Sequence, residues 1–292
     1  MRIARWLRKN TQDLTGKRVA ITGSTGGIGR WLCHYLLSLG ASLVLVDRNA
    51  AKQESLIAEL VSHHPSADVS RVIADLEDIE SVKDAAEKLV DLEPDVFIHN
   101  AGAYAIPRRV SSSGYDNVFT INFISPYYII RRLLPHLNKV SGRVVVVGSI
   151  AHRYSKSDVN DIDFSTRKRA SLVYGNAKRY LMAALPPLFD GLDCSLAVTH
   201  PGITFTGITA HYPKLIFAII KHPMKVIFMK PRRAALSVLY GVFSSTAPNE
   251  WIGPRIFGIW GLPRRTVLRG ISAEEVDRIT TAAQSIYNEL NK

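Results

Sequence analysis

The sequence predicts an α/β fold class, in which helices cover both faces of a doubly wound parallel sheet. Six short apolar segments have the length and composition of buried strands, and helical stretches such as 51–61 and 79–90 lie between them. The predicted strands are 18–22, 42–47, 69–73, 96–99, 143–148 and 194–199. Strands that alternate with amphipathic helices are typical of a parallel sheet. Because no repeat or low-complexity linker divides the chain, we expect a single domain over residues 15–292.

The composition fits a globular protein of a reducing compartment. The 292 residues are 47% hydrophobic, which is enough for one large domain with a substantial core. Two cysteines, Cys33 and Cys194, argue against a disulfide framework. No run reaches the roughly 20 apolar residues that cross a bilayer. We therefore expect a cytoplasmic location and leave membrane association open.

The net charge of +12 indicates attraction to polyanions or to anionic membrane surfaces. No nucleic-acid-binding motif is present, so we expect no nucleic-acid partner. Within residues 1–14, Ile3, Trp6 and Leu7 can share one face of a short helix among basic residues. This pattern predicts either an interfacial helix in peripheral contact with a membrane or a solvated basic arm.

A glycine-rich turn follows the first predicted strand and precedes a helical stretch over 31–39. Gly23 permits the tight turn, Gly27 lets the backbone approach a pyrophosphate, and Gly29 lets the helix pack closely on the strand. The free N–H groups at the helix N-terminus then attract phosphate. This layout predicts a dinucleotide-binding turn and a Rossmann-type sheet. The residues expected to contact the cofactor here are Thr22, Gly23, Ser24, Thr25, Gly27, Ile28 and Gly29.

The choice of cofactor depends on the end of the second predicted strand. Asp47 lies there, 18 positions after Gly29, and a carboxylate at this place accepts hydrogen bonds from the adenosine ribose and repels a 2′-phosphate. It favours NAD. Arg48 argues the other way, because an arginine can pair with the 2′-phosphate, so NADP stays an alternative. After the third strand, Asp75 and Leu76 are placed to meet the adenine, although Asp75 is equally suited to cap the next helix.

Two further strand ends carry residues that suit the rest of a dinucleotide. Small residues after the fourth strand let the backbone lie against the cofactor, and an asparagine there can tie neighbouring strand ends together. These residues are Asn100, Ala101 and Gly102. Backbone and hydroxyl groups after the sixth strand are expected to meet the nicotinamide carboxamide. These residues are Pro201, Gly202 and Thr204.

The carboxyl-terminal third contains two predicted features. The apolar, basic stretch over about 204–231 predicts a helical lid above the substrate, and its alternative is a surface helical hairpin. A last helix is expected to begin near Ser272, where Glu275 completes a capping box.

Four side chains have the chemistry of a proton-transfer site. Asn122 lies among apolar neighbours, where a buried amide satisfies backbone groups, bends the helix or holds a water. Ser149 follows the fifth strand at the edge where such sheets bind ligands, so its hydroxyl can donate to a substrate oxygen. Tyr174 and Lys178 are four residues apart and share one helical face. A nearby ammonium lowers a tyrosine pKa, and a pKa close to the working pH suits a general acid or base.

Taken in order, these motifs resemble the short-chain dehydrogenase/reductase family, classical type, over about residues 15–206. The retinol dehydrogenase-like branch is the most similar, because Ser149 and Tyr174 are 25 positions apart and Ser149-Ile-Ala-His152 resembles that branch's insert. Two features depart from the branch. Ala177 stands where it usually has serine, and Asp47 favours NAD, whereas many relatives use NADP.

The resemblance implies an NAD- or NADP-dependent oxidoreductase that transfers a hydride between the nicotinamide and an alcohol or carbonyl. It implies that Tyr174 passes the proton, that Lys178 holds the nicotinamide ribose, that Ser149 orients the substrate oxygen, and that Asn122 anchors a relay water. From the lid and the basic, aromatic N-terminus we expect a small-molecule substrate of apolar or lipid-like character. No metal site is predicted, and a homo-oligomer is left open.

Two alternatives remain at this stage. The first is a sensor or scaffold that binds NAD without catalysis, although such a protein needs neither Tyr174 nor Lys178. The second is an extended-type epimerase or dehydratase, because Gly23, Gly26 and Gly29 also fit the glycine spacing of that group.

Overall fold

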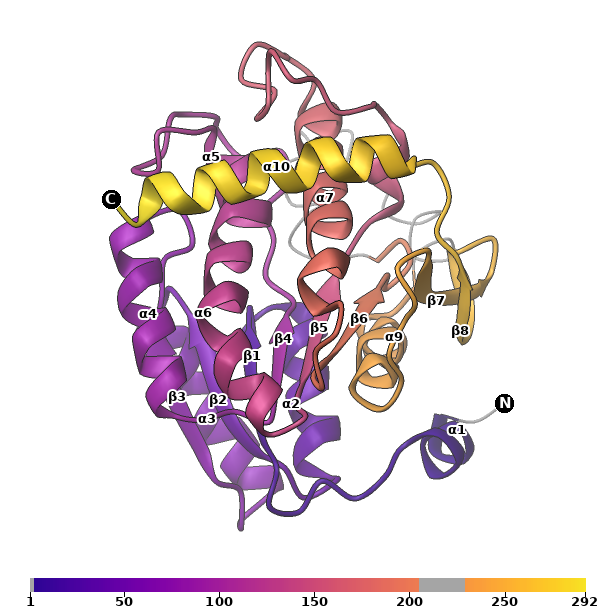
Figure 1. The fold of residues 1–292 in the computed structure, drawn as a ribbon. Coiled ribbons are helices and arrows are strands. Elements are labelled where there is room, and N and C mark those ends of the chain that lie inside the picture. Colours follow the sequence, from indigo (N-terminus) through magenta and orange to yellow (C-terminus); the bar gives the residue numbers. More distant parts are fainter. Residues whose placement is uncertain (1–2, 205–228) are drawn as a thin grey trace, which may run out of the picture.

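A mostly parallel sheet runs through the centre of the computed structural model, which describes residues 3–204 and 229–292 (Figure 1). Its eight strands lie in the order β3-β2-β1-β4-β5-β6-β7-β8, and the β7–β8 pair alone is antiparallel. The predicted fold class is confirmed, and all six predicted strands agree within one residue at each end. They are β1 (Arg18–Thr22), β2 (Ser42–Asp47), β3 (Val69–Ile73), β4 (Val96–His99), β5 (Arg143–Val147) and β6 (Ser195–Thr199).

The strand order reverses beside β1. The chain adds β2 and β3 on one side of β1 and then crosses over to place β4 on the other side. In open sheets of this kind the crevice at such a switch point, outside the carboxyl ends of the strands, binds the ligand.

The last two strands, β7 (Glu250–Ile256) and β8 (Trp260–Val267), were not predicted. Pro254 faces Pro263 across this antiparallel pair, and arginines interrupt both segments, so neither has the apolar pattern of a buried strand. Proline is tolerated at an edge, and the hairpin is the edge of the sheet.

Helices cover both faces of the sheet, as Figure 1 shows. In β1, Val19 and Ile21 join the core on one face, whereas Ala20 joins the core on the other, because successive strand residues point to opposite faces. The first layer contains α1 (Ile3–Asn10), α2 (Gly27–Leu37), α3 (Ala50–His63) and α9 (Pro231–Phe243). The second layer contains α4 (Ile79–Asp91), α6 (Ser125–Lys139), α7 (Ala170–Ala184) and α10 (Ala273–Leu290).

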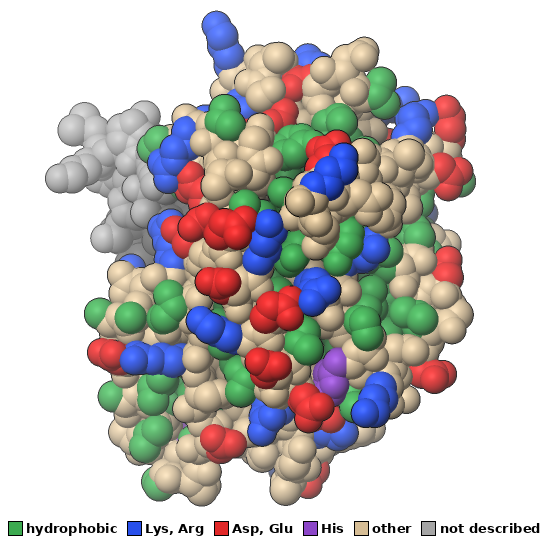
Figure 2. Space-filling model, turned by 60° about the vertical axis from the view of Figure 1, so that its left-hand side comes forward, with side chains coloured by type: hydrophobic (Ala, Val, Ile, Leu, Met, Phe, Trp, Pro, Cys, Tyr) green, Lys and Arg blue, Asp and Glu red, His purple; other side chains and the backbone are tan. Residues whose placement is uncertain are grey.

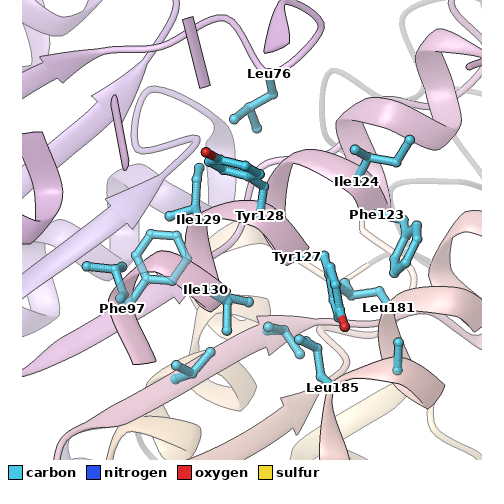
Figure 3. Packing of buried hydrophobic residues seen from close by; sticks show 14 of the residues in the cluster. Leu76, Phe97, Phe123, Ile124, Tyr127, Tyr128, Ile129, Ile130, Leu181 and Leu185 are labelled. Carbon is cyan, nitrogen blue, oxygen red and sulfur yellow. The ribbon is translucent and has the colours of Figure 1, made fainter. Parts of the chain in front are cut away.

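The buried side of α6 fixes this second layer on the sheet. Figure 3 shows Ile129 and Ile130 of α6 close to Phe97 of β4, and Tyr127 directed toward Leu181 of α7. All five side chains belong to one continuous apolar core. Burial of side chains of this size contributes roughly 1.5–3 kcal/mol each. The packing therefore holds α6 and α7 against the same sheet face, next to the carboxyl ends of β4 and β5.

The helical segment that contains Asn122 is interrupted. The structure begins it with α5 (Asn117–Phe119), continues as the π-helical turn η1 (Thr120–Ile124), and then enters α6. The Asp116 side chain caps its start by accepting from the Val118 N–H at 2.9 Å. A π-turn widens the helix by one residue and is frequent at functional sites. This one contains Asn122.

The N-terminal residues form the short helix α1, whose apolar side is docked on the domain. Trp6 is 3% exposed and meets Tyr240 of α9 edge-on, with ring centroids 5.8 Å apart. Ile3 and Leu7 pack against the same core. Of the three apolar side chains predicted for a membrane interface, Trp6 is therefore buried against the domain, and Ile3 and Leu7 are partly buried.

The remaining sequence predictions concern the lid, membrane-spanning segments and the surface charge. The predicted lid falls almost entirely on residues 205–228, outside the described part of the chain. Within the described part, no helix is both long and apolar enough to span a membrane. Figure 2 shows a face on which described Lys and Arg side chains are interspersed with Asp and Glu, so the net positive charge is not concentrated there.

Candidate active site

The turn between β1 and α2 has the geometry that its glycines predict. Gly23 has a φ of +69°, and a Cβ added to it would lie 2.8 Å from the Ala101 Cα. A Cβ on Gly29 would lie 2.2 Å from the Gly23 carbonyl oxygen, so only glycine lets α2 pack this closely on β1. Gly26 is the N-cap of α2 and offers no side chain to cap it. The first N–H groups of α2 therefore stay available to a phosphate.

A cavity of 380 Å³ lies above this turn, at the strand-order switch. It joins the turn to the ends of β2, β3 and β4, the places where a dinucleotide would lie. Of the predicted cofactor residues, those lining it are Gly23, Thr25, Gly27, Ile28, Asp47, Arg48, Asp75, Leu76, Asn100, Ala101 and Gly102. Thr22, Ser24 and Gly29 lie behind its wall and are buried.

Asn100 ties the ends of two strands together, as predicted. Its Nδ2 donates to the Thr22 carbonyl at 3.2 Å and to the Gly23 carbonyl at 2.9 Å. The Thr22 hydroxyl accepts from the Asn100 and Ala101 N–H groups at 3.2 and 3.1 Å. These bonds hold β1 and β4 in register at the cavity floor.

His99 belongs to this arrangement and was missed, because in the sequence it is simply one residue of an apolar strand. Thr22 Oγ1 uses both acceptor positions on backbone N–H groups, so its own proton goes to His99 Nδ1, 3.0 Å away. His99 is therefore the neutral tautomer with a proton on Nε2. Burial lowers the pKa of His99 well below 6.5, and the Lys178 charge lowers it further.

Asp47 contacts the turn itself rather than open solvent. Its carboxylate accepts from the Ser24 hydroxyl, from the Thr25 hydroxyl at 2.9 Å and from the Thr25 N–H at 3.3 Å. Burial raises the pKa of Asp47, and these hydrogen bonds oppose the rise. The carboxylate expected to receive the ribose hydroxyls thus already braces the phosphate-binding turn. Arg48 and Lys52 line the same end of the cavity.

The acid after β3 does not cap α4, which corrects one of the two interpretations of that position. Asp78 is the N-cap, and its Oδ1 accepts from the Glu80 N–H at 3.3 Å. Asp75 instead accepts from the Glu77 N–H at 3.0 Å and lines the cavity beside Leu76.

Two of the four predicted proton-transfer residues, Asn122 and Lys178, lie directly behind Gly102, which lines this cavity. A Cβ on Gly102 would lie 2.9 Å from Asn122 Oδ1 and 3.6 Å from Lys178 Nζ. Only the backbone of Gly102 therefore stands between the cavity and the side chains of Asn122 and Lys178. Asn122 is fully buried and pairs with the Ala103 backbone, donating to its carbonyl at 2.9 Å and accepting from its N–H at 3.3 Å. Its remaining Nδ2 proton goes to the Val118 carbonyl at 2.8 Å.

Tyr174 and Ser149 face each other across the gap between α7 and the end of β5. The Tyr174 hydroxyl is close enough to the Ser149 side chain to affect its titration, and its ring meets Tyr104 edge-on with centroids 5.3 Å apart. Burial raises the pKa of Tyr174 to about 12, although the Ser149 bond lowers it. Ser149 also caps the short 3-10 helix η2 (Ile150–Arg153) by accepting from the Ala151 N–H at 3.2 Å.

Lys178 is 1% exposed, and its Nζ donates to the Val147 carbonyl at 2.9 Å. The same Nζ lies 5.8 Å from the centroid of the Tyr174 ring. Burial lowers the pKa of Lys178 to about 7. The sequence predicted that this ammonium would lower the tyrosine pKa, but in this structure the effect of burial on both groups is larger.

The residues after β6 lie away from the described cavity. Gly202 has a φ of +81°, and a Cβ on it would lie 2.6 Å from the Ile259 carbonyl oxygen of the β7–β8 hairpin. Pro201 precedes it in the buried turn, and Thr204 forms an isolated bridge with Met229. None of the three lines the cavity, so their predicted contact with the nicotinamide remains a prediction.

The sequence is similar to a known protein family and to individual curated proteins. The family model of the short chain dehydrogenases matches residues 17–160. Among curated proteins, an uncharacterized oxidoreductase of Schizosaccharomyces pombe is 26% identical and aligns over 87% of this chain and 80% of its own length. Human retinol dehydrogenase 14 is 28% identical over 83% of this chain and 78% of its own.

Solved structures share the fold. A protein from Mycobacterium paratuberculosis superposes with a TM-score of 0.71 at 22% identity, covering 97% of this chain and 96% of that one. The RhlG/NADP complex of Pseudomonas aeruginosa has a TM-score of 0.60 at 25% identity, over 80% of this chain and 91% of its own.

Proposed function

Because this chain belongs to the short-chain dehydrogenase/reductase family, near its retinol dehydrogenase branch, we propose a catalytic site made of Asn122, Ser149, Tyr174 and Lys178. The family makes the protein a nicotinamide-dependent oxidoreductase. The observation that carries the proposal is the closeness of the Tyr174 and Ser149 side chains, with Lys178 one helical turn from Tyr174 and next to Gly102 of the cavity wall. A protein that only binds a dinucleotide has no need of this pair.

A bound nicotinamide supplies the two-electron exchange with the substrate carbon, and the chain manages the proton. Tyr174 donates its hydroxyl proton to the substrate oxygen during reduction and takes it back during oxidation. Ser149 holds that oxygen beside the phenol. Such positioned proton transfer accounts for about 10²–10⁴-fold in rate.

Lys178 and Asn122 support this transfer. The Lys178 amine uses one N–H on the Val147 carbonyl, which leaves donors for the nicotinamide ribose. With its pKa lowered to about 7, Lys178 can exchange a proton near neutral pH and reload Tyr174. Asn122 fixes the Ala103 backbone at the cavity wall, where a relay water would bind.

For the nucleotide, we infer that NADP binds at least as tightly as NAD. Asp47 engages Ser24 and Thr25 and so is less free to select a ribose hydroxyl. Arg48 and Lys52 line the adenosine end of the cavity, and two cations there suit a 2′-phosphate. This reverses the order of preference that Asp47 alone predicts.

For the substrate, we propose an apolar alcohol or carbonyl. The aromatic ring of Tyr104 packs against Tyr174, and Tyr154 is near enough to affect its titration. Such surroundings favour an apolar group beside the reacting oxygen. Similarity to retinol dehydrogenase 14, a protein named for an apolar alcohol, supports the same class.

A spectrophotometric screen tests this function. The purified protein is mixed with NADH or NADPH and a panel of apolar and small polar carbonyls, and nucleotide absorbance is followed. We expect turnover with apolar carbonyls that Tyr174→Phe reduces. Tight nucleotide binding without turnover on any substrate would instead favour the sensor or scaffold alternative.

A further inference from the structure

Glu275 does not complete the capping box that the sequence predicts at the start of α10. The Ser272 hydroxyl accepts from the Glu275 N–H at 3.3 Å, which is one half of such a box. The Glu275 carboxylate, however, turns inward and pairs with Arg179 of α7. Arg179 is 2% exposed and Glu275 is 3% exposed. A buried ion pair thus joins the last helix to the helix that carries Tyr174 and Lys178.

Both members of this pair also form hydrogen bonds with other buried or partly buried polar groups. Arg179 Nε donates to Glu275 Oε1 at 2.6 Å, and Nη2 contacts Glu275 Oε2 and the Gly270 carbonyl. Ser157 donates its N–H and hydroxyl to Glu275 Oε1 at 2.8 and 2.7 Å. Burial opposes the charge of Glu275, but the bonds from Arg179 and Ser157 hold its pKa at about 2. The pair is therefore charged near neutral pH.

The remaining guanidinium nitrogen of Arg179 connects the ion pair to the active site. Its Nη1 donates to the His152 carbonyl at 2.7 Å. The His152 ring in turn contacts the Ser149 carbonyl through Nδ1 at 2.7 Å and the Arg269 carbonyl through Nε2 at 3.0 Å. His152 is fully buried, and Trp251 packs edge-on against it with centroids 5.6 Å apart. With the His152 proton on Nδ1, hydrogen bonds connect Glu275 to the Ser149 carbonyl in three steps.

Stability alone does not account for this arrangement. Replacing a buried ion pair by apolar residues of similar volume is commonly neutral or stabilising, because the charges no longer have to be desolvated. Buried polar networks instead select one geometry among several compact ones, and that role has to be tested for each protein. Here the geometry at the end of the network is that of Ser149, which the Tyr174 hydroxyl contacts.

We propose that Arg179 and Glu275, acting through His152, are positioning residues that hold Ser149 against Tyr174, so that helix α10 sets the geometry of the active site. The proposal rests on the proposed oxidoreductase function for its kinetic readouts, and on hydrogen exchange for a readout that needs no activity.

The main experiment replaces the pair by apolar residues, Arg179→Met with Glu275→Leu. A single replacement would leave one buried charge unpaired. It would destabilise the protein strongly whether or not the pair positions Ser149. The matched control is Arg278→Met with Glu274→Leu, which removes an exposed ion pair from the same helix. We expect both double variants to melt near the wild-type temperature and to bind nucleotide normally. Only the buried replacement should lower kcat, by about 10²-fold, the cost of a small misplacement in a preorganised site.

A double-mutant cycle shows whether the pair acts through Ser149. In a Ser149→Ala background the apolar replacement should lower kcat by less than 3-fold, because the group that it positions is already gone. A full further loss in that background would mean that the pair supports the site in some other way. Wild-type kcat in the buried double variant would overturn the proposal outright.

Hydrogen exchange provides the readout that is independent of turnover. In the buried double variant, amides of residues 149–153 should exchange faster than in wild type, whereas those of α2 should not change. If the wild-type protein reduces no substrate, the proposed function fails, and the exchange result still decides the positioning role. Unchanged exchange over 149–153 would contradict it.

A second variant covers the case in which the buried replacement does not fold. His152→Gln leaves Arg179 and Glu275 paired and breaks the ring contacts to Ser149 and Arg269. We expect lower kcat, unchanged nucleotide affinity and faster exchange over 149–153. Wild-type values for both kcat and exchange would overturn the proposal.

Discussion

The Tyr174 hydroxyl lies close to the Ser149 side chain, although one residue lies on helix α7 and the other just past the end of β5. Their meeting depends on helix α7, which packs against η2 and the sheet core at the same time. A phenol and a hydroxyl held together in a partly buried place define the point where a substrate oxygen would be bound.

Replacement of Gly29 by alanine should disable the nucleotide site. A Cβ there would lie 2.2 Å from the Gly23 carbonyl oxygen, so α2 must move away from β1. Overpacking of this kind costs about 1–3 kcal/mol in the free energy of unfolding. Denaturant titration should show that loss, and fluorescence titration should show no NAD(P)H binding.

Gly26→Ala is the matched control for stability, because a Cβ there lies 3.3 Å from the same oxygen and needs only a small adjustment. Equal unfolding free energies for the two variants would show that close packing of α2 on β1 is not what Gly29 provides.

Arg48→Ala should weaken NADPH binding without changing NADH binding. A charge-assisted hydrogen bond to a phosphate is worth about 1.5–3 kcal/mol, which corresponds to roughly 10–100-fold in Kd. The measurement is a fluorescence titration with each nucleotide, and Lys88→Ala, an exposed lysine of α4, is the control. An equal loss for both nucleotides would assign Arg48 to the shared part of the cofactor instead.

The sequence was most informative where the pattern is local. Strands β1 to β6 were predicted from apolar segments, and Gly23 and Gly29 from a motif whose steric reasons the structure reproduces. The contacts that side chains make within this fold were harder to predict from the sequence. Asp47 has the expected position but is bonded to Ser24 and Thr25, a contact that depends on how the turn folds back.

The pairing of Arg179 with Glu275 could not be predicted from the sequence. Arg179 and Glu275 are 96 positions apart, and nothing near either residue identifies its partner. His99 looked like one more residue of a buried strand, and β7 and β8 lack an apolar pattern because of Pro254 and Pro263. In each case the missing information is three-dimensional: which distant groups satisfy a buried polar atom, and which strand can tolerate proline at the edge.

The stability of the protein should fall in acid partly because of Glu275. Its pKa is lowered from 4.5 to about 2 in the folded protein, so the unfolded chain binds the proton first as pH falls. The contribution of Glu275 is therefore complete above about pH 4.5 and is lost progressively toward pH 2. Urea unfolding at pH 6, 4 and 3 measures this dependence.

The Arg179→Met/Glu275→Leu variant should lose less stability than wild type between pH 6 and 3, and the exposed Arg278→Met/Glu274→Leu control should behave like wild type. An identical pH dependence in all three proteins would contradict the assignment of this titration to Glu275.

The central claim is that Tyr174 passes the proton during turnover, and Tyr174→Phe tests it most directly, because only the hydroxyl is removed. Steady-state kinetics with the best nucleotide and apolar substrate should show kcat lower by about 10²–10⁴-fold, with an unchanged nucleotide Kd. A variant that turns over at the wild-type rate would contradict the account.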